Sequence, residues 1–334
     1  MREEEKITNN KILVTGGAGF IGSNLCDVLL EQGNQVVCLD NFMTGHHKNI
    51  ESFLKNENFT LIEGDIRNYE DCQKAVAGCN YVLHQAALGS VPRSIKDPMT
   101  ATDVNVGGFV KMLFAAKEAK VKRFVYAASS STYGDSETLP KVEDKIGNPL
   151  SPYAITKFAD ELYAKNFSDI YGIETVGLRY FNVFGRRQDP NGAYAAVIPK
   201  FVMQLMKLES PIINGDGSYS RDFTYIDNVL QANQLAAITP KEKIYTQNSL
   251  SQVFNVAYGE RTNLNELVEI LKENLSAYNP KIKDIQIKHG PNRAGDIPHS
   301  LASIEKAKTY MNYNPKFSVK QGLKAACGWY WENL

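Results

Sequence analysis

The residues best suited to chemistry in this sequence are a tyrosine and a lysine four positions apart. Tyr153 and Lys157 lie in the segment 153–170, whose spacing predicts a helix, so their side chains share one helix face. A tyrosine hydroxyl has a reference pKa of about 10, but a nearby ammonium favours the phenolate. Lowering the tyrosine pKa by about three units takes roughly 4 kcal/mol of stabilisation of the phenolate over the phenol, which a dehydrated cleft can supply. The pair therefore predicts a tyrosine that exchanges a proton with a substrate.

A serine-rich strand end supplies a third candidate. Ser129 follows the apolar segment 123–128, and its hydroxyl could relay or orient a proton between a substrate and Tyr153. A tyrosine and lysine at this spacing also occur on solvated helix faces. The pair indicates catalysis only in combination with a cofactor site and this strand end.

A glycine-rich turn predicts that cofactor site. The segment reads Gly16-Gly17-Ala18-Gly19-Phe20-Ile21-Gly22. It follows a predicted strand, opens a predicted helix and is followed by Asp40 at the end of the next strand, which is the dinucleotide pattern. Glycine allows backbone to approach a pyrophosphate, and the helix N-terminus attracts it. A carboxylate at Asp40 would accept hydrogen bonds from the ribose hydroxyl groups and would repel a 2′-phosphate, so NAD is favoured over NADP. A solvent-facing Asp beside an ordinary helix start is the alternative.

Further cofactor contacts are expected where later strands end. Asp65 and Ile66 could reach the adenine, and small residues after the fourth strand would let the cofactor backbone pass. The predicted NAD-binding residues are Gly16, Gly19, Phe20, Ile21, Gly22, Asp40, Asn41, Asp65, Ile66, Gln85, Ala86, Ala87, Asn105, Tyr153 and Lys157.

Strand-like and helix-like segments alternate through the first half of the chain. Predicted strands are 11–15, 35–40, 60–65, 81–84, 123–128 and 174–180, and predicted helices include 21–32, 102–119 and 153–170. This order predicts an α/β fold, a Rossmann-type doubly wound parallel sheet with a smaller mixed α/β C-terminal lobe. We expect residues 1–182, with 222–258 returning to them, to bind NAD. Residues 183–221 and 259–334 should form the substrate lobe.

Composition narrows the classes of partner. The 334 residues carry 37 basic and 37 acidic side chains, and this balance gives no basic face for nucleic acid and no polybasic stretch for a membrane. No apolar run is long enough for a membrane span, and the N-terminus lacks a signal peptide. Five scattered cysteines have no metal-ligand spacing. We therefore expect a cytoplasmic protein with reduced thiols and no metal.

Together these residues resemble the extended short-chain dehydrogenase/reductase family over nearly the whole chain. The resemblance rests on 15–22, Asp40, 65–66, 129–131, 133–134, Tyr153, Lys157 and 178–182. Within the family, the segments 179–188 and 191–200 are most similar to UDP-N-acetylglucosamine 4-epimerases.

The resemblance implies a role for each matching residue. Tyr153 would be base and acid, Lys157 would support it and hold the nicotinamide ribose, and Ser129 would be the catalytic serine. Asn105 would lie in the cofactor cleft, and Arg221 and Arg293 would clamp the substrate diphosphate, although surface ion pairs are the alternative for both. The full predicted substrate-binding set is Ser129, Ser130, Asn182, Val197, Asn214, Arg221, Arg293 and Ser300.

Three serines distinguish members of this family. Dehydratases and decarboxylases carry acidic residues after the catalytic hydroxyl residue, whereas this chain has Ser130 and Ser131, which cannot supply a second acid–base step. Ser300 aligns with a position where tyrosine narrows the sugar pocket of epimerases restricted to unacetylated sugars. Serine leaves room for an N-acetyl group. It could equally cap a helix over 301–310.

The expected activity is an NAD-dependent 4-epimerase interconverting UDP-N-acetylglucosamine and UDP-N-acetylgalactosamine through a 4-keto intermediate, with UDP-glucose and UDP-galactose as further substrates. One alternative is a UDP-glucuronate 4-epimerase, for which Arg186 or Arg187 could bind the carboxylate. The other is a sensor that binds NAD without catalysis, against which the set Ser129, Tyr153 and Lys157 weighs. The resemblance also suggests a homodimer formed through 102–119 and 153–170.

Overall fold

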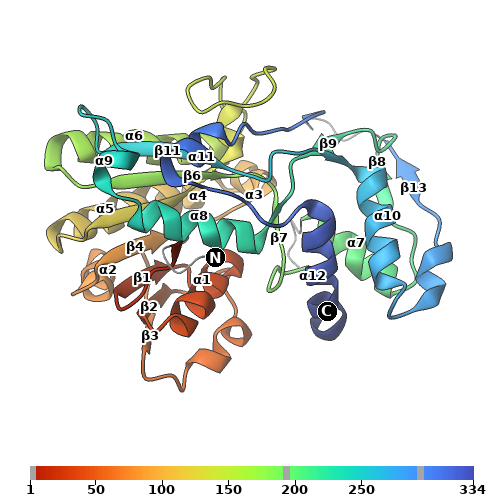
Figure 1. Ribbon diagram of the computed structural model, residues 1–334, viewed down its shortest axis with the longest axis horizontal. Helices are drawn as coiled ribbons and strands as arrows, with labels where there is room; N and C mark the ends of the chain where they lie inside the picture. The colour runs from red at the N-terminus through yellow and green to blue at the C-terminus, as the bar shows by residue number, and fades with distance from the viewer. Residues whose placement is uncertain (1–4, 191–195, 292–296) are drawn as a thin grey trace.

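The computed structural model describes residues 5–190, 196–291 and 297–334. A sheet of seven parallel strands, in the order β11-β6-β5-β4-β1-β2-β3, forms its centre (Figure 1). The strands are β1 (Lys11–Thr15), β2 (Gln35–Asp40), β3 (Phe59–Glu63), β4 (Tyr81–His84), β5 (Arg123–Ser129), β6 (Thr175–Tyr180) and β11 (Ser251–Val256). The chain changes direction across the sheet between β1 and β4. In such sheets, ligands bind at the carboxyl ends of the strands beside this point.

Side chains of β1, β2, β4 and β5 alternate between two apolar cores, one on each face of the sheet. Ile12 and Val14 belong to the first core and Leu13, between them, belongs to the second. Helices α1 (Phe20–Glu31) and α8 (Ile226–Ile238) cover the first face, and α2 (Tyr69–Val76), α5 (Phe109–Glu118) and α6 (Pro152–Tyr171) cover the second. The predicted doubly wound parallel sheet is confirmed.

The helix predicted over 102–119 is divided in the structure. It begins as α4 (Pro98–Thr102), continues through a π-helical turn (Asp103–Gly108) and ends as α5. Two glycines close the π-helical turn, and a Cβ on Gly108 would lie only 2.6 Å from the Ile66 side chain. The turn therefore brings the helix backbone close to the segment after β3. Helix α3 (Val91–Lys96) precedes this run.

The later part of the chain builds a lobe from helices and very short strand pairs. Helices α7 (Val197–Met206), α10 (Leu264–Leu275) and α12 (Val319–Asn333) pack together at one end of the molecule (Figure 1). The strand pairs are β7 (Val183–Phe184) with β10 (Thr224–Tyr225), β8 (Ile212–Asn214) with β13 (Lys288–Gly290), and β9 (Ser220–Arg221) with β12 (Thr262–Asn263). The first core runs without interruption from α1 and α8 into this lobe. The lobe is therefore joined to the sheet by shared packing.

The predicted helix over 301–310 is wrong in its first part. Helix α11 (Glu305–Met311) starts only after Ile304, and Ser300 does not cap it. Ser300 instead donates its backbone N–H to the Ser220 carbonyl at 3.0 Å, and residues 301–303 exchange backbone bonds with Lys141. These pairings hold the segment extended, which overrides its local helical pattern. Helix α11 packs against β11 and α9 (Lys241–Ile244), so this part of the predicted substrate segment lies against the sheet.

Short 3-10 helices complete the fold at His47–Asn49, Glu51–Phe53, Ser130–Tyr133 and Pro280–Asp284. Within the described ranges, no helix is both long and apolar enough to cross a membrane.

Candidate active site

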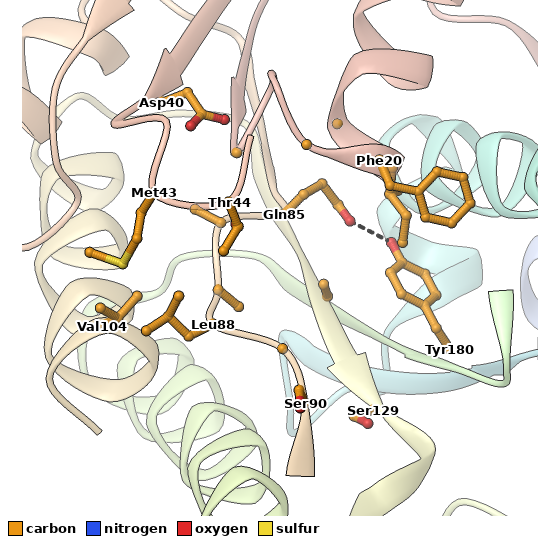
Figure 2. A pocket seen from close by; sticks show the side chains of 18 of the residues that line it. Phe20, Asp40, Met43, Thr44, Gln85, Leu88, Ser90, Val104, Ser129 and Tyr180 are labelled. Atoms are coloured by element: carbon orange, nitrogen blue, oxygen red, sulfur yellow. Dashed lines mark hydrogen bonds between the residues drawn. The ribbon is translucent and has the colours of Figure 1, made fainter. Parts of the chain in front are cut away.

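A cavity of about 640 Å³ opens at the carboxyl ends of the central strands. Figure 2 shows it reaching from Asp40 at the end of β2 to Ser129 at the end of β5, with Gln85 between them. Its lining includes residues from β2, β5, α1 and α6 and from the segments that directly follow β1 and β4. The predicted residues that line it are Gly16, Gly19, Phe20, Ile21, Gly22, Asp40, Asn41, Ile66, Gln85, Ala86, Ala87, Ser129, Tyr153, Lys157 and Asn182.

The glycine turn is built for an anion. Gly16 has φ +67°, and a Cβ there would lie 2.8 Å from the backbone nitrogen of Ala86. Any larger residue would therefore push the β1 and β4 strand ends apart. Gly19 caps α1 without a side-chain hydrogen bond, and the first turn of α1 holds no acidic residue. Its free N–H groups and positive dipole end suit the pyrophosphate of a dinucleotide.

Asp40 sits where a ribose would be held. Its carboxylate accepts hydrogen bonds from the backbone N–H of Ala18 and of Phe42, both at 2.8 Å. Burial raises the pKa of Asp40, and these two hydrogen bonds oppose that rise. Each oxygen keeps a lone pair for a hydroxyl donor. These two acceptor oxygens fit the ribose hydroxyl groups of NAD.

Two predicted cofactor residues lie outside the cavity lining. Asp65 accepts two side-chain hydrogen bonds from Arg67 and one from Asn41, and the bonds with Arg67 are the main reason that its pKa falls to about 2. Asn105 is buried and bonds the backbone of Leu88 through both its oxygen and its nitrogen. Asn105 therefore holds the cavity wall in place from behind.

Local structure fixes the candidate catalytic tyrosine and lysine at the start of α6. Ser151 caps the helix by accepting from the Ala154 N–H, and the Tyr153 N–H donates to Ser94 Oγ at 3.0 Å. Lys157 Nζ donates to the Ala127 carbonyl at 3.0 Å and to Asp160 Oδ2 at 3.2 Å. An ammonium has three donors, so one remains for the cavity that Lys157 lines.

Ser129 is oriented by a neighbour that the sequence prediction did not include. Its hydroxyl oxygen accepts from the Ser131 N–H at 3.2 Å and from the Ser131 hydroxyl at 2.9 Å. Both acceptor positions of Ser129 are then occupied, and its own proton is free to be donated. Ser129 is thereby prepared to donate to an oxygen in the cavity.

The predicted substrate residues divide between two places. Asn182 lines the cavity, and its side chain donates to the Asp222 carbonyl. Arg221 and Ser300 lie near each other outside that lining, because Arg221 Nη1 donates to the Pro298 carbonyl and Ser300 pairs with Ser220. Ser130, Val197 at the start of α7, and Asn214 at the end of β8 also lie outside the lining. Arg293 falls outside the described residues.

The cavity includes residues that sequence reasoning missed. Met43 and Thr44 follow β2, and Ser90 follows β4, so an extension of the strand-end rule would have found them. Arg93 comes from the first turn of α3, and no motif in the sequence marks it. It adds a cation to the cavity lining.

This chain is similar to known proteins over most of its length. Residues 12–257 match the family described as NAD dependent epimerase/dehydratase. A UDP-N-acetylglucosamine 4-epimerase from Methanobrevibacter ruminantium M1, solved with UDP-N-acetylmuramic acid, has a TM-score of 0.88 at 37% identity over 98% of this chain and 100% of its own. A UDP-glucose 4-epimerase from Thermotoga maritima, solved with UDP-glucose, has a TM-score of 0.86 at 34% identity, over 96% and 99%.

A third solved structure carries both a cofactor and an acidic sugar. It is a UDP-glucuronic acid 4-epimerase from Bacillus cereus with UDP-glucuronic acid and NAD, with a TM-score of 0.84 at 31% identity, over 96% of this chain and 99% of its own. This chain belongs to the NAD dependent epimerase/dehydratase family. Within that family it is an NAD-dependent UDP-sugar 4-epimerase.

Proposed function

We propose that this enzyme interconverts UDP-N-acetylglucosamine and UDP-N-acetylgalactosamine, and also accepts the unacetylated pair. The observation that carries the proposal is a single cavity lined by the glycine turn, Asp40, Ser129, Tyr153 and Lys157. A bound NAD supplies a hydride acceptor and donor at its nicotinamide. The protein's own side chains carry out the proton transfer and the orientation of the sugar.

The side chains divide the acid–base work at the sugar C4 oxygen. Tyr153 takes the proton of the 4-hydroxyl as a 4-keto sugar forms, and returns it to the opposite epimer after the sugar has turned over. Ser129 donates a hydrogen bond from its hydroxyl group to the same oxygen and keeps its proton, because Ser131 occupies its acceptor positions. The Lys157 ammonium favours the ionised form of Tyr153. The oxidised sugar returns to the alcohol in each turnover, so the cofactor is not consumed.

One feature supports an epimerase over a dehydratase, and a second supports acetylated sugars as its substrates. Serines at 130 and 131 offer no carboxyl group for an elimination, which a dehydratase would require. Ser300 is a small side chain beside Arg221, held there by its backbone bond to Ser220. If Arg221 and Arg293 clamp the diphosphate, Ser300 lies next to the sugar and leaves room for an N-acetyl group.

Proton NMR of product formation without added cofactor tests this function. UDP-N-acetylglucosamine, UDP-glucose and UDP-glucuronate are incubated separately with the purified protein. We expect UDP-N-acetylgalactosamine to form faster than UDP-galactose, and Tyr153→Phe to abolish both while retaining NAD. Turnover of UDP-glucose alone would contradict the acetyl pocket. A requirement for stoichiometric NADH would contradict the redox-neutral cycle.

UDP-glucuronate is the second candidate substrate, because one observation favours it. Arg186 and Arg187, the cations expected from the sequence, are ion-paired with Asp227 at 2.6 Å and with Asp27 at 2.7 Å. Arg93 lines the catalytic cavity instead and could face a sugar carboxylate. Faster turnover of UDP-glucuronate than of either neutral sugar would favour this assignment.

The division of labour and the assembly are part of the same proposal. Residues 1–182 and 222–258 would hold NAD, and 183–221 and 259–334 would hold the UDP-sugar. Helix α6 exposes an apolar row that a second copy could cover, and the side chains of this row are between 42% and 62% exposed: Ile155, Leu162, Tyr163 and Ile170. Light scattering at the mass of two chains would support a homodimer, and a single-chain mass would contradict it.

A further inference from the structure

A buried carboxyl group lies directly beneath the catalytic lysine. Asp160 is one helical turn after Lys157 on α6, and its side chain is 0% exposed against 3% for the lysine. Asp160 Oδ2 accepts from Lys157 Nζ at 3.2 Å, and Oδ1 has no hydrogen-bond partner among the residues that the structure describes. A carboxylate buried with one oxygen unsatisfied is costly, so this group is poised to take up a proton.

The neighbours of Asp160 do not neutralise it in any other way. Glu161, the next residue, forms its own buried pair with Arg179 on β6 at 2.7 Å. Tyr126 on β5 interacts electrostatically with Asp160, yet its hydroxyl has no hydrogen-bond partner. Burial, and secondarily the charge of Lys157, lowers the pKa of His84 on β4 to about 3, so His84 is neutral. Among the residues that the structure describes, Lys157 is therefore the cation that pairs with Asp160.

The ammonium of Lys157 has a hydrogen-bonded side beneath the cavity and a side that faces the cavity. Below the cavity, it is held by the Ala127 carbonyl and by Asp160; above, it lines the cavity with Tyr153. An ionised Asp160 partly cancels the positive field at Tyr153, and a protonated Asp160 leaves that field intact. Burial raises the pKa of Asp160 to about 7, against the opposing charge of Lys157, so both states are populated near neutral pH.

We propose that Asp160 is a positioning residue that holds Lys157 from beneath the cavity and, through its protonation, sets how strongly Lys157 favours the ionised form of Tyr153. This inference rests on the proposed acid–base role of Tyr153. The exchange involves a proton only: Asp160 releases it as pH rises, and Tyr153 then loses its own proton less readily.

The neutral isostere Asp160→Asn tests the proposal by ultraviolet titration of tyrosinate, with Tyr153→Phe subtracted in each background. At acid pH the two curves should coincide, since Asp160 is neutral in both proteins. As Asp160 ionises in the wild type, tyrosinate should form at higher pH in the wild type than in the variant. The midpoint of the Tyr153 titration in Asp160→Asn should therefore lie about half a pH unit to one pH unit lower. The pH profiles of kcat/KM for the wild type and Asp160→Asn should differ by about threefold in the same pH range.

Asp169→Asn is the matched control. Asp169 lies on the same helix and pairs with Lys165, but it is exposed, so its removal should leave the Tyr153 titration unchanged. If Asp160→Asn does not fold, Asp160→Ser takes its place. The wild-type titration is a further test, because two coupled groups give a curve shallower than a one-proton curve.

An unchanged midpoint in folded, NAD-containing Asp160→Asn, or a shift to higher pH, would overturn the proposal. A one-proton wild-type curve would do the same. Wild-type turnover of UDP-sugars measures the proposed function separately, and its failure would leave the titration result interpretable.

Discussion

The two halves of the site are constructed differently. The cofactor half is formed by the ends of parallel strands of four to seven residues, with its carboxylate and its glycine turn fixed by backbone contacts. The proposed substrate half is formed by paired strands of two or three residues, and its candidate clamp, Arg221, lies on one of them. A short strand pair holds a side chain less firmly than a seven-stranded sheet does. We therefore expect substitutions in the first half to affect folding and cofactor retention, and those in the second half to affect substrate affinity.

Gly16→Ala should give the largest effect in the cofactor half. The added Cβ would meet the Ala86 backbone at 2.8 Å, in a left-handed backbone conformation that alanine resists. We expect at least a tenfold loss of NAD retained on purification and a lower Tm. Gly33→Ala is the control, because Gly33 also has a positive φ of +77° but nothing lies within 4 Å of a Cβ there. Equal NAD content in both variants would show that the turn tolerates a side chain.

Arg221→Ala tests the substrate half. Loss of a charge-assisted contact with a diphosphate costs about 1.5–3 kcal/mol, which corresponds to a rise of roughly 10- to 100-fold in KM. The NAD content should not change. Arg261→Ala is the control, since Arg261 is exposed and lies next to β12, the strand paired with β9. A variant at 221 that loses NAD instead would show that the two halves are not separable.

Ser300→Tyr should change selectivity more than overall activity. A tyrosine at this position would occupy the volume proposed for the N-acetyl group, and the backbone bond from residue 300 to Ser220 would remain. We expect about a tenfold loss of kcat/KM for UDP-N-acetylglucosamine, equivalent to roughly 1.4 kcal/mol, with UDP-glucose turnover retained. Equal losses for the two sugars would place Ser300 away from the N-acetyl group.

The same contrast explains how far the sequence could predict the site. The glycine turn, Asp40, Tyr153 and Lys157 depend on local patterns, namely a strand followed by a turn, a strand end and a helical spacing, and the structure brings them into one cavity. The positions of Arg221 and Ser300 depend on pairing between distant segments. Ser300 follows Ser220 by 80 positions, and its bond to that residue cancels the helix expected after it. Such pairing leaves no periodic signal.

Asp160 was likewise not predictable from the sequence. On a helix that bears Tyr153 and Lys157, an aspartate three positions after the lysine resembles an ordinary surface ion pair. The structure shows that both partners are buried and that one carboxyl oxygen has no partner. Burial depends on what β5 and β6 place against the helix, which the helical pattern alone does not specify.

The pH dependence of stability offers the finest comparison of the two halves. Asp222 is also buried and accepts backbone N–H groups from Tyr258, Gly259 and Ala302, which lie at the junction of sheet and lobe. Burial raises the pKa of Asp222 to about 7, as it does for Asp160, well above the unfolded value of about 3.9. The folded chain then binds more protons than the unfolded chain between about pH 4 and 7, so its stability falls as pH rises through that range.

We expect each of these two carboxyl groups to contribute a fall of about 2 kcal/mol in the unfolding free energy between pH 5 and 7. Urea denaturation of the wild type and Asp160→Asn at these two pH values measures the part due to Asp160. The variant should show a smaller fall, because residue 160 no longer has a proton to lose in this range. Asp169→Asn should behave as the wild type, since that carboxyl group is exposed. If the Asp160→Asn and wild-type slopes coincide, Asp160 is ionised throughout this range and contributes nothing to the pH dependence of stability.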